Sequence, residues 1–226
     1  MKYYIKLLIK FFLGYCKLQP IMAATAFPIL KSKYFAGLKS AKIFEKKEIL
    51  WDFVINKFNQ EPLDFFEFGV HRGHSIKYFS ERLKNVNNNF VGFDSFIGLP
   101  ETHNHPSLEK GTFSREGEMP KIEDSRVKFV KGFFNEKKVE IVNELDKSKN
   151  IKLVHFDADL YSSTLFLLFA LDDCAPYYAI FDEFGGDEVR ALYSYLISTD
   201  RKVEIIATTY DDKLKIVPRE TFMRII

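Results

Sequence analysis

The chain has 226 residues, with 33 lysines and arginines against 31 aspartates and glutamates, and 46% of its residues are hydrophobic. This length favours one domain with a core of its own. The nearly balanced charge removes the compositional case for a nucleic-acid binder, and a chain this apolar is not disordered. The two cysteines, Cys16 and Cys174, form no C-x-x-C pair, so neither a disulfide framework nor a structural zinc site is supported. We therefore expect a soluble globular protein of the cytoplasm.

The first 17 residues predict an amphipathic helix. Lys2, Lys6, Lys10 and Lys17 would form one basic stripe on a surface that is otherwise apolar. The lysines interrupt every long apolar run, so we expect neither a signal peptide nor a membrane span. Such a helix either packs on the domain or on a second copy of the chain, or it lies on an anionic membrane surface. Packing is the expected role, and peripheral membrane contact through residues 1–17 stays open as the alternative.

Helical and strand patterns then alternate along the chain. We expect residues 1–60 to form a helical appendage, with a helix over 42–59, and residues 61–226 to form the main domain. A long loop with little periodicity, 95–125, is typical of a functional lid. Strands are predicted over 63–68, 90–94, 127–130, 151–157 and 177–182, helices over 75–84, 135–146, 162–171 and 188–198, and a closing hairpin over 203–209 and 213–217. This order predicts an α/β fold with a doubly wound, mostly parallel, Rossmann-like sheet and a C-terminal antiparallel hairpin.

Acidic residues end four of the five predicted parallel strands. In a doubly wound sheet, ligands bind beyond the carboxyl ends of the strands, so these residues are the first candidates for a site. An acidic residue at a strand end is also an ordinary helix cap, which is the alternative for each one taken alone. The strand-end residues are Glu67, Asp94, Gly132 with Phe133, Asp157, and Asp182 with Glu183.

The first strand end is followed by a glycine turn between two acids. Glu67 precedes a turn with the spacing G-x-x-x-G (Gly69 and Gly73), which differs from the G-x-G-x-x-G of dinucleotide binders. An acid before the glycines suits a ligand with a free amine, and Asp94, 21 residues after Gly73, is placed to accept the hydroxyls of a ribose. Together these features predict a binding site for S-adenosylmethionine. The expected cofactor-binding residues are Glu67, Gly69, Gly73, Ser75, Asp94, Ser95, Gly132 and Phe133.

A second group of acids predicts a cation site. Asp157 and Asp159 follow one strand, and Asp182 and Glu183 follow the next. Carboxylates from adjacent strand ends can converge on one hard divalent cation such as Mg²⁺, Ca²⁺ or Mn²⁺. The alternative is that these acids serve only as caps and salt-bridge partners.

Four strings resemble the macrocin O-methyltransferase family. They are E-F-G-V-H-R-G (67–73), D-S-F-I-G-L-P (94–100), V-K-G-F-F (130–134) and D-A-D-L-Y-S-S-T (157–164), and the similarity runs from about residue 65 to 191. The resemblance implies a class I methyltransferase fold, S-adenosylmethionine as methyl donor, a divalent metal, usually Mg²⁺, and a sugar or related hydroxyl, on a small molecule or a glycan, as acceptor. By motif position it implies metal ligands at Asp157, Asp182 and Glu183, and a general base at Asp159.

Two other classes of function remain open from the sequence. One is a non-catalytic protein that binds S-adenosylmethionine or a partner, although every acidic strand end is retained. The other is a different nucleotide-dependent α/β enzyme, such as a sugar dehydrogenase, although the G-x-G-x-x-G fingerprint is missing. The sequence does not identify the acceptor.

Overall fold

The protein folds around one eight-stranded sheet. A computed structural model describes residues 26, 28–102, 108–210 and 217–226. The strand order is β1-β7-β8-β6-β5-β2-β3-β4, and every described pair is parallel except those of β8 with β6 and β7. The strands are β1 (Lys42–Phe44), β2 (Leu63–Phe68), β3 (Asn89–Asp94), β4 (Val127–Lys131), β5 (Ile151–Phe156), β6 (Tyr177–Phe181), β7 (Val203–Tyr210) and β8 (Pro218–Ile225). The predicted fold class is therefore confirmed.

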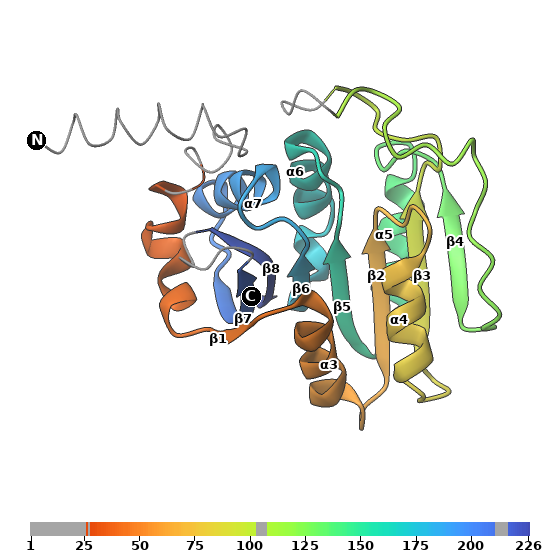
Figure 1. Cartoon of the computed structure of the whole chain (residues 1–226), viewed down its shortest axis with the longest axis horizontal. Coiled ribbons are helices and arrows are strands. Elements are labelled where there is room, and N and C mark those ends of the chain that lie inside the picture. Colours follow the sequence, from red (N-terminus) through yellow and green to blue (C-terminus); the bar gives the residue numbers. More distant parts are fainter. Residues whose placement is uncertain (1–25, 27, 103–107, 211–216) are drawn as a thin grey trace, which may run out of the picture.

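Helices cover both faces of the sheet (Figure 1). One face carries α3 (Lys47–Phe58) and α4 (His74–Arg82), and the other carries α5 (Lys138–Lys147), α6 (Tyr161–Ala170) and α7 (Asp187–Ser198), with the short 3-10 helices η1 (Lys33–Lys39) and η2 (Asp172–Cys174). Successive strand residues point to opposite faces, so Phe65 packs on the α3/α4 side while Phe66 and Phe68 pack on the side of α5, α6 and α7. Burial on both faces explains why these strands are almost continuously apolar.

The helix predicted over 42–59 begins later than expected. Residues 42–44 form the edge strand β1, with Lys42 opposite Ala207 of β7, and α3 begins only at Lys47. Ile43 is 48% exposed, so it does not belong to the apolar face that the spacing suggested. Pairing with β7 gives the backbone hydrogen-bond partners that a helix would otherwise have supplied.

The second strand of the C-terminal hairpin also lies later than predicted. Of the range 213–217, residues 213–216 fall outside the described residues, and β8 occupies 218–225. It begins with a proline, as strands tolerate at their first position. Arg219, Glu220 and Arg224 interrupt its apolar pattern, but β8 lies between β6 and β7 and Glu220 is buried.

Two further predictions are not tested by the described residues. The amphipathic segment 1–17 lies outside the described residues, and the domain boundary at residue 60 stays a prediction. Within the described ranges, no helix is both long and apolar enough to cross a bilayer. Between β3 and β4, the described residues of the predicted loop contain neither helix nor strand.

Candidate active site

A cavity of about 530 Å³ opens at the carboxyl ends of the central strands. This volume lies within the usual range for small-molecule sites. Its walls come from the ends of β2, β3, β4, β5 and β6, and from the loop after β3, which adds Leu99 and Phe113. Of the predicted site residues, those that line it are Gly69, Asp94, Ser95, Gly132, Phe133, Asp157, Asp159, Asp182 and Glu183.

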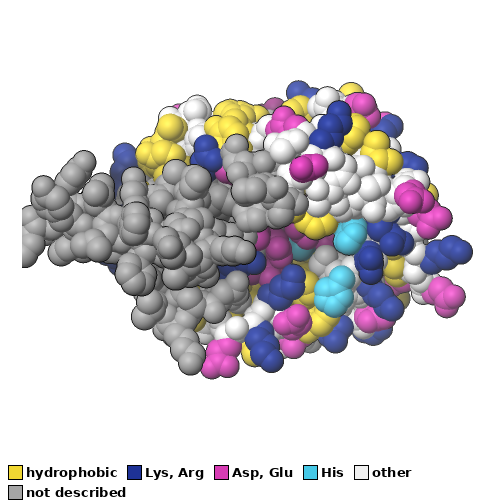
Figure 2. Space-filling view, turned by 45° about the horizontal axis from the view of Figure 1, so that its top comes forward, with side chains coloured by type: hydrophobic (Ala, Val, Ile, Leu, Met, Phe, Trp, Pro, Cys, Tyr) yellow, Lys and Arg dark blue, Asp and Glu magenta, His cyan; other side chains and the backbone are white. Residues whose placement is uncertain are grey.

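The cavity is strongly acidic. Of its described lining residues, six are acidic and none is a lysine or arginine. Figure 2 shows acidic side chains in a hollow beside histidine side chains. Like charges in one partly buried cavity repel one another, so the arrangement favours a ligand that carries positive charge. The six acids are Asp94, Glu101, Asp157, Asp159, Asp182 and Glu183.

Asp94 closes the turn between β2 and α4. Its Oδ2 accepts hydrogen bonds from the backbone N–H groups of Val70 and His71, both at 2.8 Å, and its Oδ1 accepts one from Phe96 at 2.7 Å. His71 and Phe96 both have positive φ, at 49° and 56°, which side chains seldom adopt. The carboxylate thus compensates for a strained backbone and fixes the cavity wall next to β3.

Position 69 requires a glycine because the chain segments that follow β2 and β5 pack closely together there. Its φ is +94°, and a Cβ there would lie 1.8 Å from the backbone oxygen of Asp157. Gly73 differs, because a Cβ there would meet Pro120 and Ile122 at 3.0–3.3 Å, and the residue does not line the cavity. The turn glycines therefore have separate roles, and a substitution at Gly73 would meet the β3–β4 loop rather than the cavity.

The structure also places Glu67 and Ser75 away from the cavity wall. Glu67 is fully buried on the α3/α4 side of the sheet, where its Oε1 accepts hydrogen bonds from Ser75 Oγ and from His155 Nδ1, the latter at 3.0 Å. Glu67 has the strand parity of Phe65, which packs on that side. Its carboxylate connects β2 to β5 on the α3/α4 side of the sheet through His155. The role at the cofactor amine that the sequence suggested stays a prediction.

His155 is buried, as its place in a strand suggests, but it is a charged centre rather than a simple core residue. Burial opposes its protonation, but the hydrogen bond and charge of Glu67, together with Asp157 and Glu220, outweigh this and raise the pKa of His155 to about 9. Glu220 is also buried, and burial raises its pKa to about 7 although His155 opposes the shift. Glu220 carried no signal in the sequence, because β8 interrupts its own apolar pattern.

Asp157 and Asp159 both reach the cavity from the end of β5. Burial and the charge of Asp182 raise the pKa of Asp157 well above its usual value. Burial and the charges of Glu183, Asp182 and Asp94 raise the pKa of Asp159 to about 7. Asp159 also has a φ of 56°, which turns the chain out of the strand direction. A carboxyl group with a pKa near neutrality can both accept and release a proton under physiological conditions.

The structure does not assemble Asp157, Asp182 and Glu183 around one point. Asp182 Oδ1 lies 3.4 Å from Lys47 Nζ, and Glu183 Oε1 lies 3.1 Å from Arg219 Nη1. In the described part of the chain, the one group of three potential ligands that lie within 4.8 Å of one another is instead His155, Asp182 and Glu220.

Glu188 is a site residue that sequence reasoning missed. It is 1% exposed at the start of α7, and its Oε1 and Oε2 accept hydrogen bonds from the backbone N–H groups of Ala158 and Glu183, at 3.2 and 3.0 Å. Burial and the charges of Asp157 and Asp182 raise its pKa well above the usual value. Glu188 joins the ends of β5 and β6 and so fixes the spacing of the acids above it. A glutamate in the first turn of a helix is ordinary, because it favours the helix dipole, so the sequence did not single this residue out.

Solved structures share this fold. The O-methyltransferase NovP is 19% identical over 75% of this chain and 74% of that chain, with a TM-score of 0.50. An O-methyltransferase from Bacillus cereus in complex with SAH is 13% identical over 90% of both chains, with a TM-score of 0.48. The structure described as cmcI-D160 Mg-SAM is 13% identical over 79% of this chain and 70% of that chain, with a TM-score of 0.49. No family model and no curated protein matches the chain.

The likeness to NovP shows the fold, which is the Rossmann-like fold of class I methyltransferases. Strand order, the antiparallel β8 and the cavity at the carboxyl ends of the parallel strands all agree with this class.

Proposed function

We propose that this protein is an S-adenosylmethionine-dependent O-methyltransferase that uses a divalent cation and methylates a hydroxyl group of a sugar or a related acceptor. The observation that carries the proposal is the strand-end cavity, with Asp159 on its wall among carboxylates from the ends of β3, β5 and β6. Burial and the charges of Glu183, Asp182 and Asp94 raise the pKa of Asp159 to about 7. General-base catalysis is most effective when the pKa of the base is near the working pH. A hydroxyl acceptor needs such a base, whereas a purely binding protein does not.

The residues that would hold S-adenosylmethionine lie on one side of the cavity. Asp94 and Ser95 end β3, and Gly69 and Gly132 offer backbone without side chains at φ values of +94° and +146°. Phe133 continues this wall with an apolar surface. An acidic, partly apolar cavity suits a ligand that combines a purine, a ribose, an amine and a sulfonium cation, because the ammonium and sulfonium charges are positive.

The acids on the other side of the cavity supply donors suited to a divalent cation, which would have to draw them closer together to bind all three. The donors of Asp157, Asp182 and Glu183 are all carboxylate oxygens, which hard cations such as Mg²⁺ prefer. Burial and the charge of Asp182 raise the pKa of Asp157, so its ionised form is unfavourable unless a cation lies beside it. Lys47 and Arg219 contact Asp182 and Glu183 from outside the cavity lining, so both acids keep a second oxygen for a ligand.

When bound, S-adenosylmethionine supplies the methyl group and the cation lowers the pKa of the acceptor hydroxyl. Asp159 would take the proton from that hydroxyl as the methyl group passes from sulfur to oxygen, with the electrons of the carbon–sulfur bond left on sulfur. Asp94 and the glycine turns hold the donor side of the cavity in place, so that donor and acceptor meet in line. Glu188 keeps the loops that carry Asp159 and Glu183 at a fixed separation.

The resemblance to macrocin O-methyltransferases supports a sugar or related hydroxyl as the acceptor. We further propose a cytoplasmic location, no nucleic-acid partner, and a role for residues 1–17 either in assembly with a second copy of the chain or at a membrane surface.

The test is equilibrium binding followed by turnover. Calorimetry should show that the full-length protein binds S-adenosylmethionine and does not bind NAD. Methyl transfer from labelled S-adenosylmethionine to a panel of sugars, nucleotide sugars and polysaccharide fragments, with Mg²⁺ present, then identifies the acceptor. Binding of NAD in place of S-adenosylmethionine would replace the proposal by a dehydrogenase, and cofactor binding without turnover on any acceptor would favour a non-catalytic role.

A further inference from the structure

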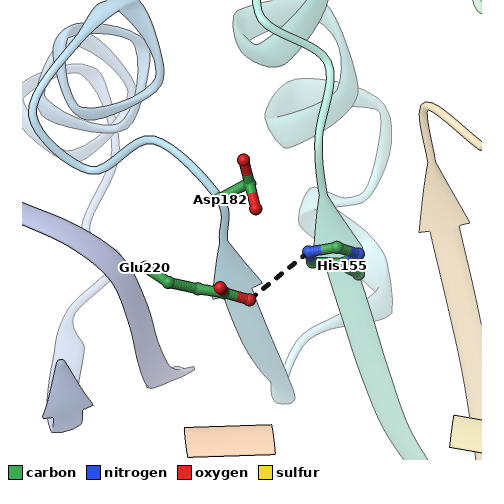
Figure 3. Close-up of side chains that lie close together, drawn as sticks. All are labelled: His155, Asp182 and Glu220. Carbon is green, nitrogen blue, oxygen red and sulfur yellow. Dashed lines mark ion pairs between the residues drawn. The ribbon is translucent and has the colours of Figure 1, made fainter. Parts of the chain in front are cut away.

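Beneath the cavity, on the α3/α4 side of the sheet, three side chains from neighbouring strands converge. His155 belongs to β5, Asp182 follows β6, and Glu220 belongs to β8 (Figure 3). One ligand atom from each lies within 4.8 Å of the others. His155 and Glu220 are buried, whereas Asp182 is partly exposed and lines the cavity. Asp182 therefore joins this buried cluster to the cavity.

His155 is held as a metal-binding histidine is held. Its Nδ1 donates a hydrogen bond to Glu67 Oε1 at 3.0 Å, and its Nε2 points towards Glu220 (Figure 3). Nε2 is buried and has no hydrogen-bond partner, and the nearest Glu220 oxygen, Oε1, is 3.8 Å away. Metal-ligating histidines almost always donate their other ring N–H to a carboxylate or carbonyl, which fixes the ring and directs the free nitrogen to the metal.

Glu220 is oriented in the same manner. Its Oε1 accepts a hydrogen bond from Trp51 Nε1, and its Oε2 is buried without a hydrogen-bond partner. A buried carboxylate oxygen without a partner loses its hydration and gains nothing in return. Two buried, unpartnered polar atoms, His155 Nε2 and Glu220 Oε2, thus belong to the same small cluster, and each is on a side chain that a second residue holds in place.

From this arrangement we infer a second metal site, in which His155 Nε2 and carboxylate oxygens of Asp182 and Glu220 bind one first-row transition-metal dication of the Zn²⁺ or Fe²⁺ class. In a tetrahedral site, two ligands that are each about 2.1 Å from the ion lie about 3.4 Å apart. Ligand atoms within 4.8 Å of one another therefore need to approach by at most about 1.4 Å, which small side-chain rotations supply. A nitrogen ligand favours such an ion over Mg²⁺, which prefers oxygen. Asp182 would be shared with the cavity, so the ion also sets the orientation of that carboxylate.

Lys47 is the competing cation. Its Nζ lies 3.4 Å from Asp182 Oδ1, and its side chain is 44% exposed. Burial lowers its pKa, but the charges of Asp182, Glu220 and Asp157 outweigh burial and raise it. Without an ion, this ammonium group and a proton on His155 neutralise the cluster. The exposed Lys47 side chain can turn out to solvent when an ion enters.

Trp51 reports directly on the site. It is the single tryptophan of the chain and donates its indole N–H to Glu220. We propose to titrate the full-length protein with Co²⁺ in excess Mg²⁺, which fills oxygen-only sites, and to follow the quenching of tryptophan fluorescence. The expected result is saturable quenching with one Co²⁺ per chain, counted by calorimetry.

Four variants decide the assignment. Glu220→Gln removes a ligand and should weaken Co²⁺ binding at least tenfold. Glu67→Gln keeps all three ligands but weakens the support of His155, and it should weaken binding about 10- to 100-fold. Lys47→Gln removes the competitor and should tighten binding about 2- to 5-fold, the worth of an exposed ion pair. Glu101→Gln, the matched control on the cavity rim, should bind as the wild type does.

Absence of saturable quenching in the wild type would overturn the inference and leave His155 and Glu220 as an ion pair. Equal Co²⁺ affinity in the wild type and in folded Glu220→Gln would also overturn the inference. If Glu220→Gln does not fold, Glu67→Gln decides, because an unchanged affinity in that variant, once shown to be folded, is incompatible with His155 as a ligand. None of these measurements involves a methyl donor or acceptor, so a failure of the proposed methyl transfer would leave the metal site standing, and the reverse also holds.

Discussion

Replacing Asp159 by asparagine should separate catalysis from binding. Asparagine keeps the size of the side chain and its hydrogen bonding but cannot take a proton. Turnover should fall about 10²- to 10⁴-fold, the usual contribution of a general base. Affinities for S-adenosylmethionine and Mg²⁺ should stay near those of the wild type, because Asp159 is assigned to the acceptor.

The same substitution should stabilise the fold. The pKa of Asp159 is about 7 in the folded protein against an ordinary 3.8. A difference of about 3 units corresponds to at most ~4 kcal/mol, which a bound cation and solvent reduce. Because the folded pKa is the higher one, the wild type loses this stability as pH rises from about 4 to 7. Asp159→Asn should therefore raise the melting temperature above pH 7, in Mg²⁺-free buffer, and should have little effect near pH 4.

The assay is methyl transfer at low and high Mg²⁺ for Asp159→Asn and for the matched variant Asp157→Asn. Extra Mg²⁺ should partly restore Asp157→Asn, which loses a cation ligand, and should not restore Asp159→Asn. In the wild type, kcat/KM should rise with pH along a limb at or below about pH 7, since Asp159 must be ionised to accept a proton. Rescue of Asp159→Asn by Mg²⁺, without rescue of Asp157→Asn, would show that the two roles are reversed.

Three further outcomes are expected. Exhaustive treatment with EDTA should abolish turnover and Mg²⁺ should restore it; full activity of the chelated enzyme would leave the acids as caps. Gly69→Ala should lower the affinity for S-adenosylmethionine at least tenfold by calorimetry, because its Cβ would overlap the Asp157 carbonyl, whereas Gly73→Ala should have the smaller effect. Arg126 donates to the carbonyls of Ser80 and Leu83 at 2.7 and 2.6 Å, so Arg126→Ala should cost about 2–4 kcal/mol in urea unfolding, and a cost below about 1 kcal/mol would refute that role.

The parallel part of the sheet could be predicted because each strand is buried on both faces. Leu63–Phe68 and Ile151–Phe156 are apolar enough to be located directly, and an acid follows or ends most of these strands. The edge strand β1 could not be predicted, because its three residues are mostly exposed and their order depends on pairing with β7, which is far away in the sequence. Strand β8 was predicted too early, at 213–217, because the charged residues that interrupt its apolar pattern find their partners only in three dimensions.

The cavity acids could be predicted for the same reason, since the carboxyl ends of parallel strands meet at one edge. The direction in which each side chain points could not be predicted from the sequence. The sequence predicted both Glu67 and Asp94 at strand ends. In the structure, Glu67 lies one residue before the end of β2 and points to the α3/α4 side, whereas Asp94 is the last residue of β3 and turns back to cap the glycine loop. A difference of one residue in where the strand stops therefore separates a supporting side chain from one on the cavity wall.

The acids on the two sides of the cavity floor form one electrostatic system. On the cavity side, burial and mutual repulsion raise the pKa values of Asp157 and Asp159. On the α3/α4 side of the sheet, they raise the pKa of Glu220. Asp182 belongs to both sides, since it lines the cavity and also lies within 4.8 Å of His155 and Glu220. A fold that keeps so many carboxyl groups together loses stability unless cations join them. Positive charge bound on either side of Asp182 would therefore change the proton affinity of the acids on the other side, which links the lower cluster to the chemistry of the cavity.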